Sequence, residues 1–143
     1  MTDTGKIQNI HLLTDVFGKF PSFHDAEVHR INLIRGETRS FNPTLMAVIN
    51  VFEMTSEIDE KNHYVLKNNV LVEFHFSGVR NLELVNFNNQ NVLQMLEIKQ
   101  VSDADDEKTD FDVLFEGVFG VSTSFRCEAI SIESVMPFEK TTV

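Results

Sequence analysis

Residues 70–77 read VLVEFHFS, and this stretch decides the fold class of the chain. Its side chains alternate, because one parity is wholly apolar and the other mostly polar: Val70, Val72, Phe74 and Phe76 against Leu71, Glu73, His75 and Ser77. Successive side chains of a β-strand point to opposite faces of a sheet, so the alternation predicts a strand with one buried and one solvated face. Such strands are typical of antiparallel sheets, which can leave one face in water.

Strand signals continue on both sides of this stretch. We predict further strands at residues 27–35, 45–54, 82–84, 93–101, 111–119 and 121–135, the last one stopping before Pro137. Both parities of 45–54 are apolar, which predicts a strand covered on both faces. Residues 56–69 are predicted to form a long connection with at most a short strand. The acidic stretch 102–110 is predicted to be a hairpin loop that is too charged to be buried.

One helix is predicted near the N-terminus. Residues 7–17 carry apolar side chains at helical spacing, and Gly18 follows as a left-handed terminator. Pro21 then biases Phe20 toward extended geometry, so the chain leaves the helix and enters a strand. The expected fold is α+β but mostly β: an antiparallel sheet of about seven strands with one N-terminal helix packed on it, in a single domain over residues 1–143.

The inward parities of these elements define the expected core, which is rich in the thirteen phenylalanines of the chain. The predicted core residues are Leu13, Phe17, Phe23, Val28, Ile31, Val48, Val72, Phe74, Phe76, Leu84, Leu96, Val113, Phe115 and Phe125. Phe111 and Phe119 are expected on the apolar face of their strand as well. Cys127 is the only cysteine, so an internal disulfide is excluded and we expect an inert core thiol.

The chain carries 12 Lys and Arg against 22 Asp and Glu, which gives a net charge of -10. Such a protein is a poor ligand for nucleic acid, because phosphate binding requires cations that displace counterions. The charge favours a basic partner or simply keeps the protein soluble. No apolar run reaches the roughly 18 to 20 residues of a membrane span, and the N-terminus MTDTGKIQNI is unlike a signal peptide. The sequence therefore predicts a cytoplasmic protein without membrane contact.

The most conspicuous candidate site is the pair His24 and Asp25. A His beside a carboxylate can act in acid–base catalysis or bind a metal. Adjacent side chains on an extended chain point to opposite faces, however, and the sequence offers no convergent set of partners. We therefore expect His24 to lie partly buried between Phe20 and Phe23, and Asp25 to cap backbone amides where the strand begins, rather than either to catalyse a reaction.

Asp25, Glu27 and His29 share a parity, which aligns two carboxylates and an imidazole along one strand face. The row is weakly metal-like. The same parity continues into Ile31, so either a bulge near Arg30 switches the faces or the row runs into the core. A solvated strand face explains the row better, and the sequence lacks phosphate-binding and calcium-binding motifs. We therefore expect no metal ion, no cofactor and no catalytic residue.

Residues 20–28, FPSFHDAEV, resemble the opening signature of the immunity protein 50 family of bacterial polymorphic toxin systems. Residues 87–92, FNNQNV, with Leu96 and Ile98 after them, are similar to a second part of that pattern. Phe20 stands where such proteins often have Trp. The resemblance implies a small cytoplasmic protein that binds and neutralises a toxin. It places the candidate binding residues in the two segments: Phe23, His24, Asp25, Glu27, Asn89, Gln90 and Asn91.

Three functions remain open on the sequence. The first is a binding module, an immunity protein that occludes a toxin through a protein–protein interface, with a basic toxin domain as the expected partner. The second is a metal-dependent or acid–base enzyme centred on the His24-Asp25 segment. The third is a β domain that binds a small ligand or assembles with itself. The resemblance favours the first of these.

Overall fold

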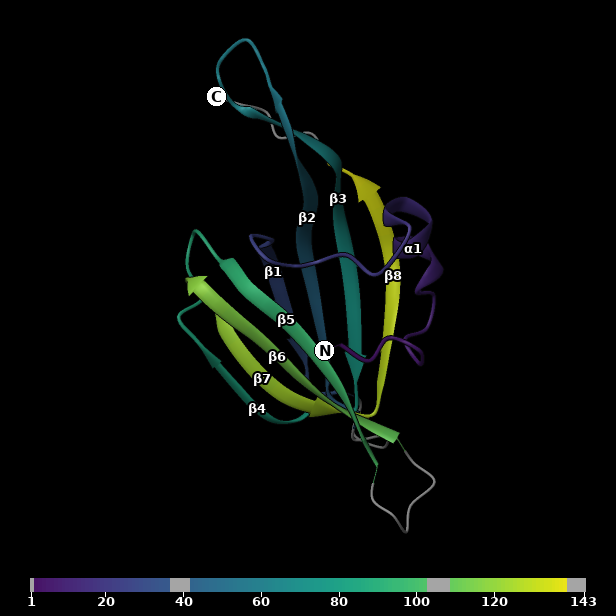
Figure 1. Cartoon of the computed structure of the whole chain (residues 1–143). Coiled ribbons are helices and arrows are strands. Elements are labelled where there is room, and N and C mark those ends of the chain that lie inside the picture. Colours follow the sequence, from purple (N-terminus) through teal and green to yellow (C-terminus); the bar gives the residue numbers. More distant parts are fainter. Residues whose placement is uncertain (1, 37–41, 103–108, 139–143) are drawn as a thin grey trace.

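The computed structural model describes residues 2–36, 42–102 and 109–138. In this part of the chain one helix is followed by eight strands (Figure 1). Their bounds are α1 His11–Phe17, β1 Glu27–Ile34, β2 Thr44–Ile58, β3 Tyr64–Ser77, β4 Arg80–Val85, β5 Val92–Ser102, β6 Thr109–Phe119, β7 Ser122–Cys127 and β8 Ala129–Pro137. The expectation of a mostly β fold with one N-terminal helix is confirmed. Of the predicted acidic loop, residues 103–108 lie outside the described residues.

The strands form one antiparallel sheet in the order β4-β7-β6-β5-β1-β2-β3-β8. β3 continues into β4 through Gly78 and Val79, and β7 continues into β8 through Glu128. Because β3 pairs with β8 and β4 pairs with β7, both bends lie at one corner, where the Glu128 amide donates to the Ser77 carbonyl at 2.9 Å. The corner divides the sheet into a first half, β1, β2, β3 and β8, and a second half, β4 to β7. These halves lie as two layers in Figure 1.

The predicted single strand at 121–135 is wrong, because the corner divides it. β7 pairs with β4 and β6, whereas β8 pairs with β3. Gly78 is required at this corner, since its φ is 68° and a Cβ atom there would lie 2.7 Å from the Glu128 side chain. The stretch 121–135 contains neither Gly nor Pro, but its apolar parity changes at the bend, from the odd positions up to Cys127 to the even positions Ile130 and Ile132.

The core lies between the two layers. The ring of Phe76 in the first half lies 5.0 Å from that of Phe125 and 6.1 Å from that of Phe115, both in the second half. Eleven of the predicted core residues are buried: Leu13, Phe17, Phe23, Val28, Val72, Phe74, Phe76, Leu96, Val113, Phe115 and Phe125. Ile31 and Leu84 are half-buried and pack against this cluster. Cys127 is also buried, as predicted, and desolvation raises the pKa of its thiol to about 12.

The prediction that Val48 belongs to the core is wrong, as is the prediction that both faces of its strand are covered. The buried face of β2 consists of Leu45, Ala47, Ile49 and Val51. Val48 and Met46 point to the outer face of the first half, where they are half-exposed. Apolar residues at both parities therefore do not require two covers, because the pleat of an antiparallel sheet can leave one of them at the surface.

The predicted long connection at 56–69 is also wrong, because β2 and β3 are much longer than expected. β2 continues to Ile58 and β3 begins at Tyr64, so the connection spans 59–63. β1 first pairs with β2 at Asn50, and β8 ends opposite Val70, so the ribbon beyond them has no neighbouring strand among the described residues. We call residues 53–67 the arm, which projects beyond the layers in Figure 1.

The helix is shorter than the predicted 7–17, since α1 comprises 7 residues. Before it, Gln8 forms a parallel bridge to Ser131, so the first part of the segment lies along β8 instead of coiling. Gly18 ends the helix as predicted, with φ 76° and a hydrogen bond from its amide to the Thr14 carbonyl at 2.7 Å. α1 packs against β8 and β3 with Leu13 buried. Among the described residues, no helix is long and apolar enough to span a membrane.

Candidate functional site

The two segments that carry the family resemblance lie side by side. The Asp25 amide donates to the Leu93 carbonyl at 2.9 Å, and the Leu93 amide donates to the Ala26 carbonyl at 2.8 Å. One step further, the Val28 amide donates to the Asn91 carbonyl at 2.8 Å. The backbone after Phe23 is therefore hydrogen-bonded to the start of β5. Residues that are more than sixty positions apart in the sequence thus share one end of the sheet.

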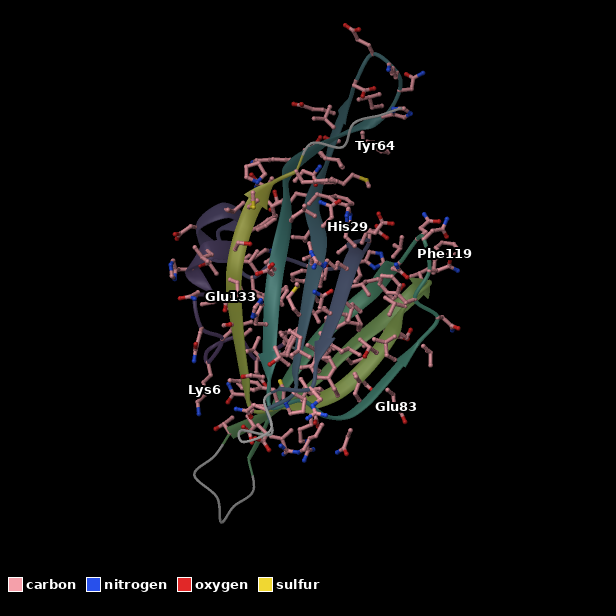
Figure 2. All side chains as sticks on the ribbon, turned by 180° about the vertical axis from the view of Figure 1, so that it is seen from behind. Lys6, His29, Tyr64, Glu83, Phe119 and Glu133 are labelled. Carbon is pink, nitrogen blue, oxygen red and sulfur yellow. The ribbon has the colours of Figure 1, made fainter. Side chains whose placement is uncertain are left out.

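A third segment, the turn between β6 and β7, joins the same end of the sheet. Val92 pairs with Glu27 on one side and with Phe119 on the other. We call the surface formed by residues 24–29, 87–92 and 116–121 the turn end. Figure 2 shows Phe119 at the outer end of its strand and His29 near the same end of the molecule. The turn end is thus built from strand ends and tight turns rather than from long loops.

The side chain of Asn91 holds the three segments together. It is only 3% exposed. Its Oδ1 accepts hydrogen bonds from the amides of Asn88 at 2.9 Å and Val121 at 3.0 Å. Its Nδ2 donates to the carbonyls of Asn88 at 2.7 Å and Val28 at 3.3 Å. Both hydrogen-bond donors and both acceptor positions of this amide are used within the protein, so Asn91 is a structural residue of the turn end.

Gly120 makes the close approach to Asn91 possible. Its φ is 77°, a conformation that favours glycine, and a Cβ atom there would collide with the Gln90 carbonyl and the Asn91 side chain. The turn between β6 and β7 therefore packs directly on the segment before β5. Because both turns are fixed in this way, the side chains that they present to solvent are held on a rigid base.

His24 and Asp25 lie in a turn, and the expectations for both are corrected. His24 is exposed, with Nδ1 3.0 Å from the Gln94 carbonyl oxygen, rather than buried between two phenylalanines. Asp25 has φ 70°, and its carboxylate makes no hydrogen bond to a backbone amide of the described residues. The turn also brings the two side chains to one side, with His24 Nε2 3.7 Å from Asp25 Oδ1. The extended geometry assumed from sequence would have separated them.

Of the two alternatives for the row of Asp25, Glu27 and His29, the structure shows the bulge near Arg30. The register of β1 on β2 shifts between Val28 and Arg30, and His29 lies at that shift. Its Nε2 lies 3.7 Å from Glu27 Oε1, with each side chain 32% exposed. The His29 ring also packs edge-on against Phe138 at 5.3 Å between centroids. The row of Asp25, Glu27 and His29 therefore lies at the surface. In the described parts of the chain, no group of three or more His, Cys, Asp or Glu side chains could hold a metal ion.

Sequence reasoning missed the exposed apolar side chains of the turn end. Phe87 is 47% exposed, Val118 is 48% exposed and Phe119 is 62% exposed. The strand parity predicted that Phe119 points inward, which is wrong because the register of β6 on β5 shifts just before it. Leu93 pairs with Gly117, whereas Val92 pairs with Phe119. The extra residue turns the strand end outward. The two glycines that flank Phe119 within three residues were the available signal.

The turn end also carries carboxylates. Asp25 and Glu116 are exposed and Glu27 is half-exposed. The three segments of the turn end contain neither Lys nor Arg. The surface therefore combines apolar side chains with negative charge, which suits contact with a protein of opposite charge.

A comparison with protein families matched residues 9–138 to the family described as Immunity protein 50. The chain belongs to this family. The match begins just before α1 and extends through β8, so it includes the whole turn end and the arm. The family resemblance stated for the segments at 20–28 and 87–92 is thereby confirmed. No curated protein and no solved structure matched the chain.

The candidate binding residues of this Immunity protein 50 chain divide into two groups. His24, Asp25, Asn89 and Gln90 are exposed at the turn end, and Glu27 is half-exposed beside them. Phe23 and Asn91 are each 3% exposed. The ring of Phe23 lies 5.8 Å from that of Phe74, so Phe23 is a core residue that supports the segment from beneath. Only the exposed and half-exposed candidates, together with the exposed aromatic side chains, are accessible for direct contact with a partner.

Proposed function

We propose that this chain is an immunity protein that neutralises a toxin domain by binding it, and that it does so without catalysing a reaction. The observation that carries the proposal is the family match over residues 9–138. It is supported by the turn end, whose buried amide network and fixed turns present side chains for contact rather than a set of convergent catalytic groups.

The turn end has the composition of a binding surface. Interfaces are enriched in aromatic side chains at their centre and are surrounded by a polar, hydrated rim. Phe87, Val118 and Phe119 are the exposed apolar side chains of the turn end, and Asp25 and Glu27 are among its carboxylates. A partner that covers the aromatic side chains would remove them from water, and a few such anchors normally dominate the binding free energy.

The partner fitted by this surface is a basic toxin domain that meets the chain in the cytoplasm. The chain has a net charge of -10, and the turn end carries only carboxylates among its permanently charged groups. A positively charged toxin surface would be attracted over several ångströms before contact. Binding that blocks the toxin's site, or holds the toxin in an inactive state, would be sufficient for immunity.

The proposal is tested with the toxin domain encoded beside the gene of this chain. Cells that express that domain should stop growing, and co-expression of this chain should restore growth. With purified proteins, residual toxin activity should fall linearly to zero at about one chain per toxin, because a binding inhibitor is consumed in the complex. Loss of toxin activity at far fewer chains than toxin molecules would instead indicate catalysis and contradict the proposal.

Raising the salt concentration from about 0.05 to 0.5 M should slow association with the toxin by about an order of magnitude or more, and should change dissociation less. The reason is that the Debye length, roughly 8 Å at physiological ionic strength, limits the range of the acidic field. Stopped-flow mixing at several salt concentrations measures both rates. A salt-independent association rate would disprove electrostatic steering and leave the immunity role intact.

A further inference from the structure

The arm carries an apolar face that no other described part of the chain covers. Met54 pairs with Leu66 and Ile58 pairs with Tyr64 across the ribbon. Paired residues share a face, and Tyr64 and Leu66 are two positions apart, so all four side chains lie on one side of the arm. Met54 and Ile58 are each 58% exposed and Tyr64 is 56% exposed. Figure 2 shows Tyr64 well beyond the layers of the sheet.

The tip of the arm is an ordered turn rather than a loose loop. One carboxylate oxygen of Asp59 accepts hydrogen bonds from the amides of Lys61 at 2.8 Å and His63 at 2.9 Å. These bonds, the one from His63 first, lower the pKa of Asp59, so the carboxylate is ionised at neutral pH. The Asp59 amide donates to the His63 carbonyl at 2.8 Å. The arm is therefore preorganised, which reduces the conformational entropy lost when it binds.

An isolated two-stranded ribbon is only marginally stable in water, and its exposed apolar side chains gain nothing from burial in the free protein. Tyr and Met are, however, enriched where proteins contact one another. The arm also carries four carboxylates, Glu53, Glu57, Asp59 and Glu60, against two lysines. Its charge therefore has the same sign as that of the turn end.

The arm and the turn end rise from the same end of the sheet. Glu27, at the edge of the turn end, pairs with Asn50, and the arm begins three residues later at Glu53. Figure 1 shows the arm projecting above the layers, with the turns that join β4 to β5 and β6 to β7 lower and to its left. By the pairing of β2 and β3, Met54 and Leu66 continue the outer face of the first half, the face of Met46 and Val48. A protein that contacts both the arm and the turn end would therefore reach around the outer side of β2.

We propose that the arm is a second contact with the toxin domain, and this inference rests on the proposed function. Met54, Ile58 and Tyr64 lie in an apolar groove of the toxin, and the carboxylates of the arm pair with Lys or Arg side chains at the edges of that groove. The turn end provides the other contact. Two separate contacts of the same charge select a basic partner of the right shape and hold it from two sides.

The test is the double variant Ile58→Thr with Tyr64→Thr, which removes the apolar face while keeping residues that favour strands. Its affinity for the toxin domain encoded beside this gene, measured by isothermal calorimetry, should fall at least about tenfold, because truncated interface anchors commonly cost that much or more. Circular dichroism and thermal unfolding verify that the variant remains folded.

The matched control is the double variant Leu33→Thr with Ile34→Thr. These side chains are 56% and 59% exposed but lie at the far end of β1, opposite the start of β2 near the corner. The control should bind the toxin as tightly as the natural chain. If the natural chain binds and the arm variant binds equally well, the inference is wrong and the proposed function survives.

Two other outcomes also count against the inference. A natural chain that does not bind the toxin at all contradicts the proposed function and removes the partner of the arm with it. Sedimentation equilibrium of the chain alone should give the mass of a monomer. A dimer that becomes monomeric in the Ile58→Thr and Tyr64→Thr variant would show that a second copy of the chain, and not a toxin, covers the arm.

Discussion

Replacing Phe74 by alanine is expected to lower the free energy of unfolding by roughly 3 to 5 kcal/mol, the usual cost of the cavity left by a buried aromatic ring. Phe74 has no exposed surface. Its ring lies 5.8 Å from those of Phe23 and Phe76. It therefore packs between Phe23, which precedes β1, and Phe76, which contacts the second half of the sheet. Urea melts of the natural chain and the variant measure the difference.

The control for this variant is Phe119→Ala. Phe119 is 62% exposed, so its removal should change the free energy of unfolding by no more than about 0.5 kcal/mol. The comparison separates the size of the side chain from its position. A loss below about 1 kcal/mol for Phe74→Ala would mean that the inner face of β3 is not the one described.

Replacing Asn91 by alanine should cost roughly 2 to 4 kcal/mol, because the change leaves the buried amide of Val121 and the carbonyl of Val28 without their partner. The effect should be local as well as global. Hydrogen exchange at Val121 is expected to become faster by more than the change in overall stability explains, since this amide bonds directly to Asn91. Denaturant melts and amide exchange by NMR measure the two effects.

Asn89→Ala is the matched control for Asn91→Ala. Asn89 lies two positions earlier and is exposed, and the hydrogen bond found there uses its backbone amide rather than its side chain. Its replacement should leave stability within about 0.5 kcal/mol of the natural value. Equal losses of unfolding free energy in the two variants would show that replacing any asparagine of this turn destabilises the protein. The hydrogen bonds of the buried Asn91 side chain would then have no special role.

Local patterns in the sequence were sufficient for much of the fold. Alternation in 70–77 correctly predicted the buried face of β3, including Phe74. The bulge near Arg30 was one of two alternatives, which arose because the parity of the polar row continues into Ile31. Gly18 marked the end of the helix. In each case the deciding chemistry lies within a few residues of the feature.

Some of the errors have causes that lie elsewhere in the chain, and others came from overlooking a local signal. The bend at Glu128 matches a bend at Gly78, fifty positions earlier, and its local signal, the change of apolar parity between Cys127 and Ile130, was missed. The arm forms because β2 and β3 pair with each other, although none of their residues beyond the buried pair Val51 and Val70 belongs to the core. Val48 is apolar yet lies on the outer face. Pairing between distant segments decided the length of the arm and the face of Val48, and hydrophobic pattern alone does not encode it.

The candidate site, like the fold, was predicted from the sequence only in part. The two segments that carry the resemblance meet at the turn end, but the resemblance does not indicate which of their side chains face solvent. Asn91 is a hidden structural amide, and Phe119 was assigned to the core although it is exposed. A register shift and a hydrogen-bond network separate these outcomes, and both require the partner strands to be known.

The most direct test of the toxin-binding account is the affinity of the natural chain and of Phe119→Ala for the toxin domain encoded beside this gene, measured by isothermal calorimetry. The account predicts a complex of one chain with one toxin domain. It also predicts that Phe119→Ala, which should fold normally, binds at least about 30-fold more weakly, as expected for an aromatic anchor worth about 2 kcal/mol. A toxin that fails to bind the natural chain, or that binds both proteins equally, would contradict the account.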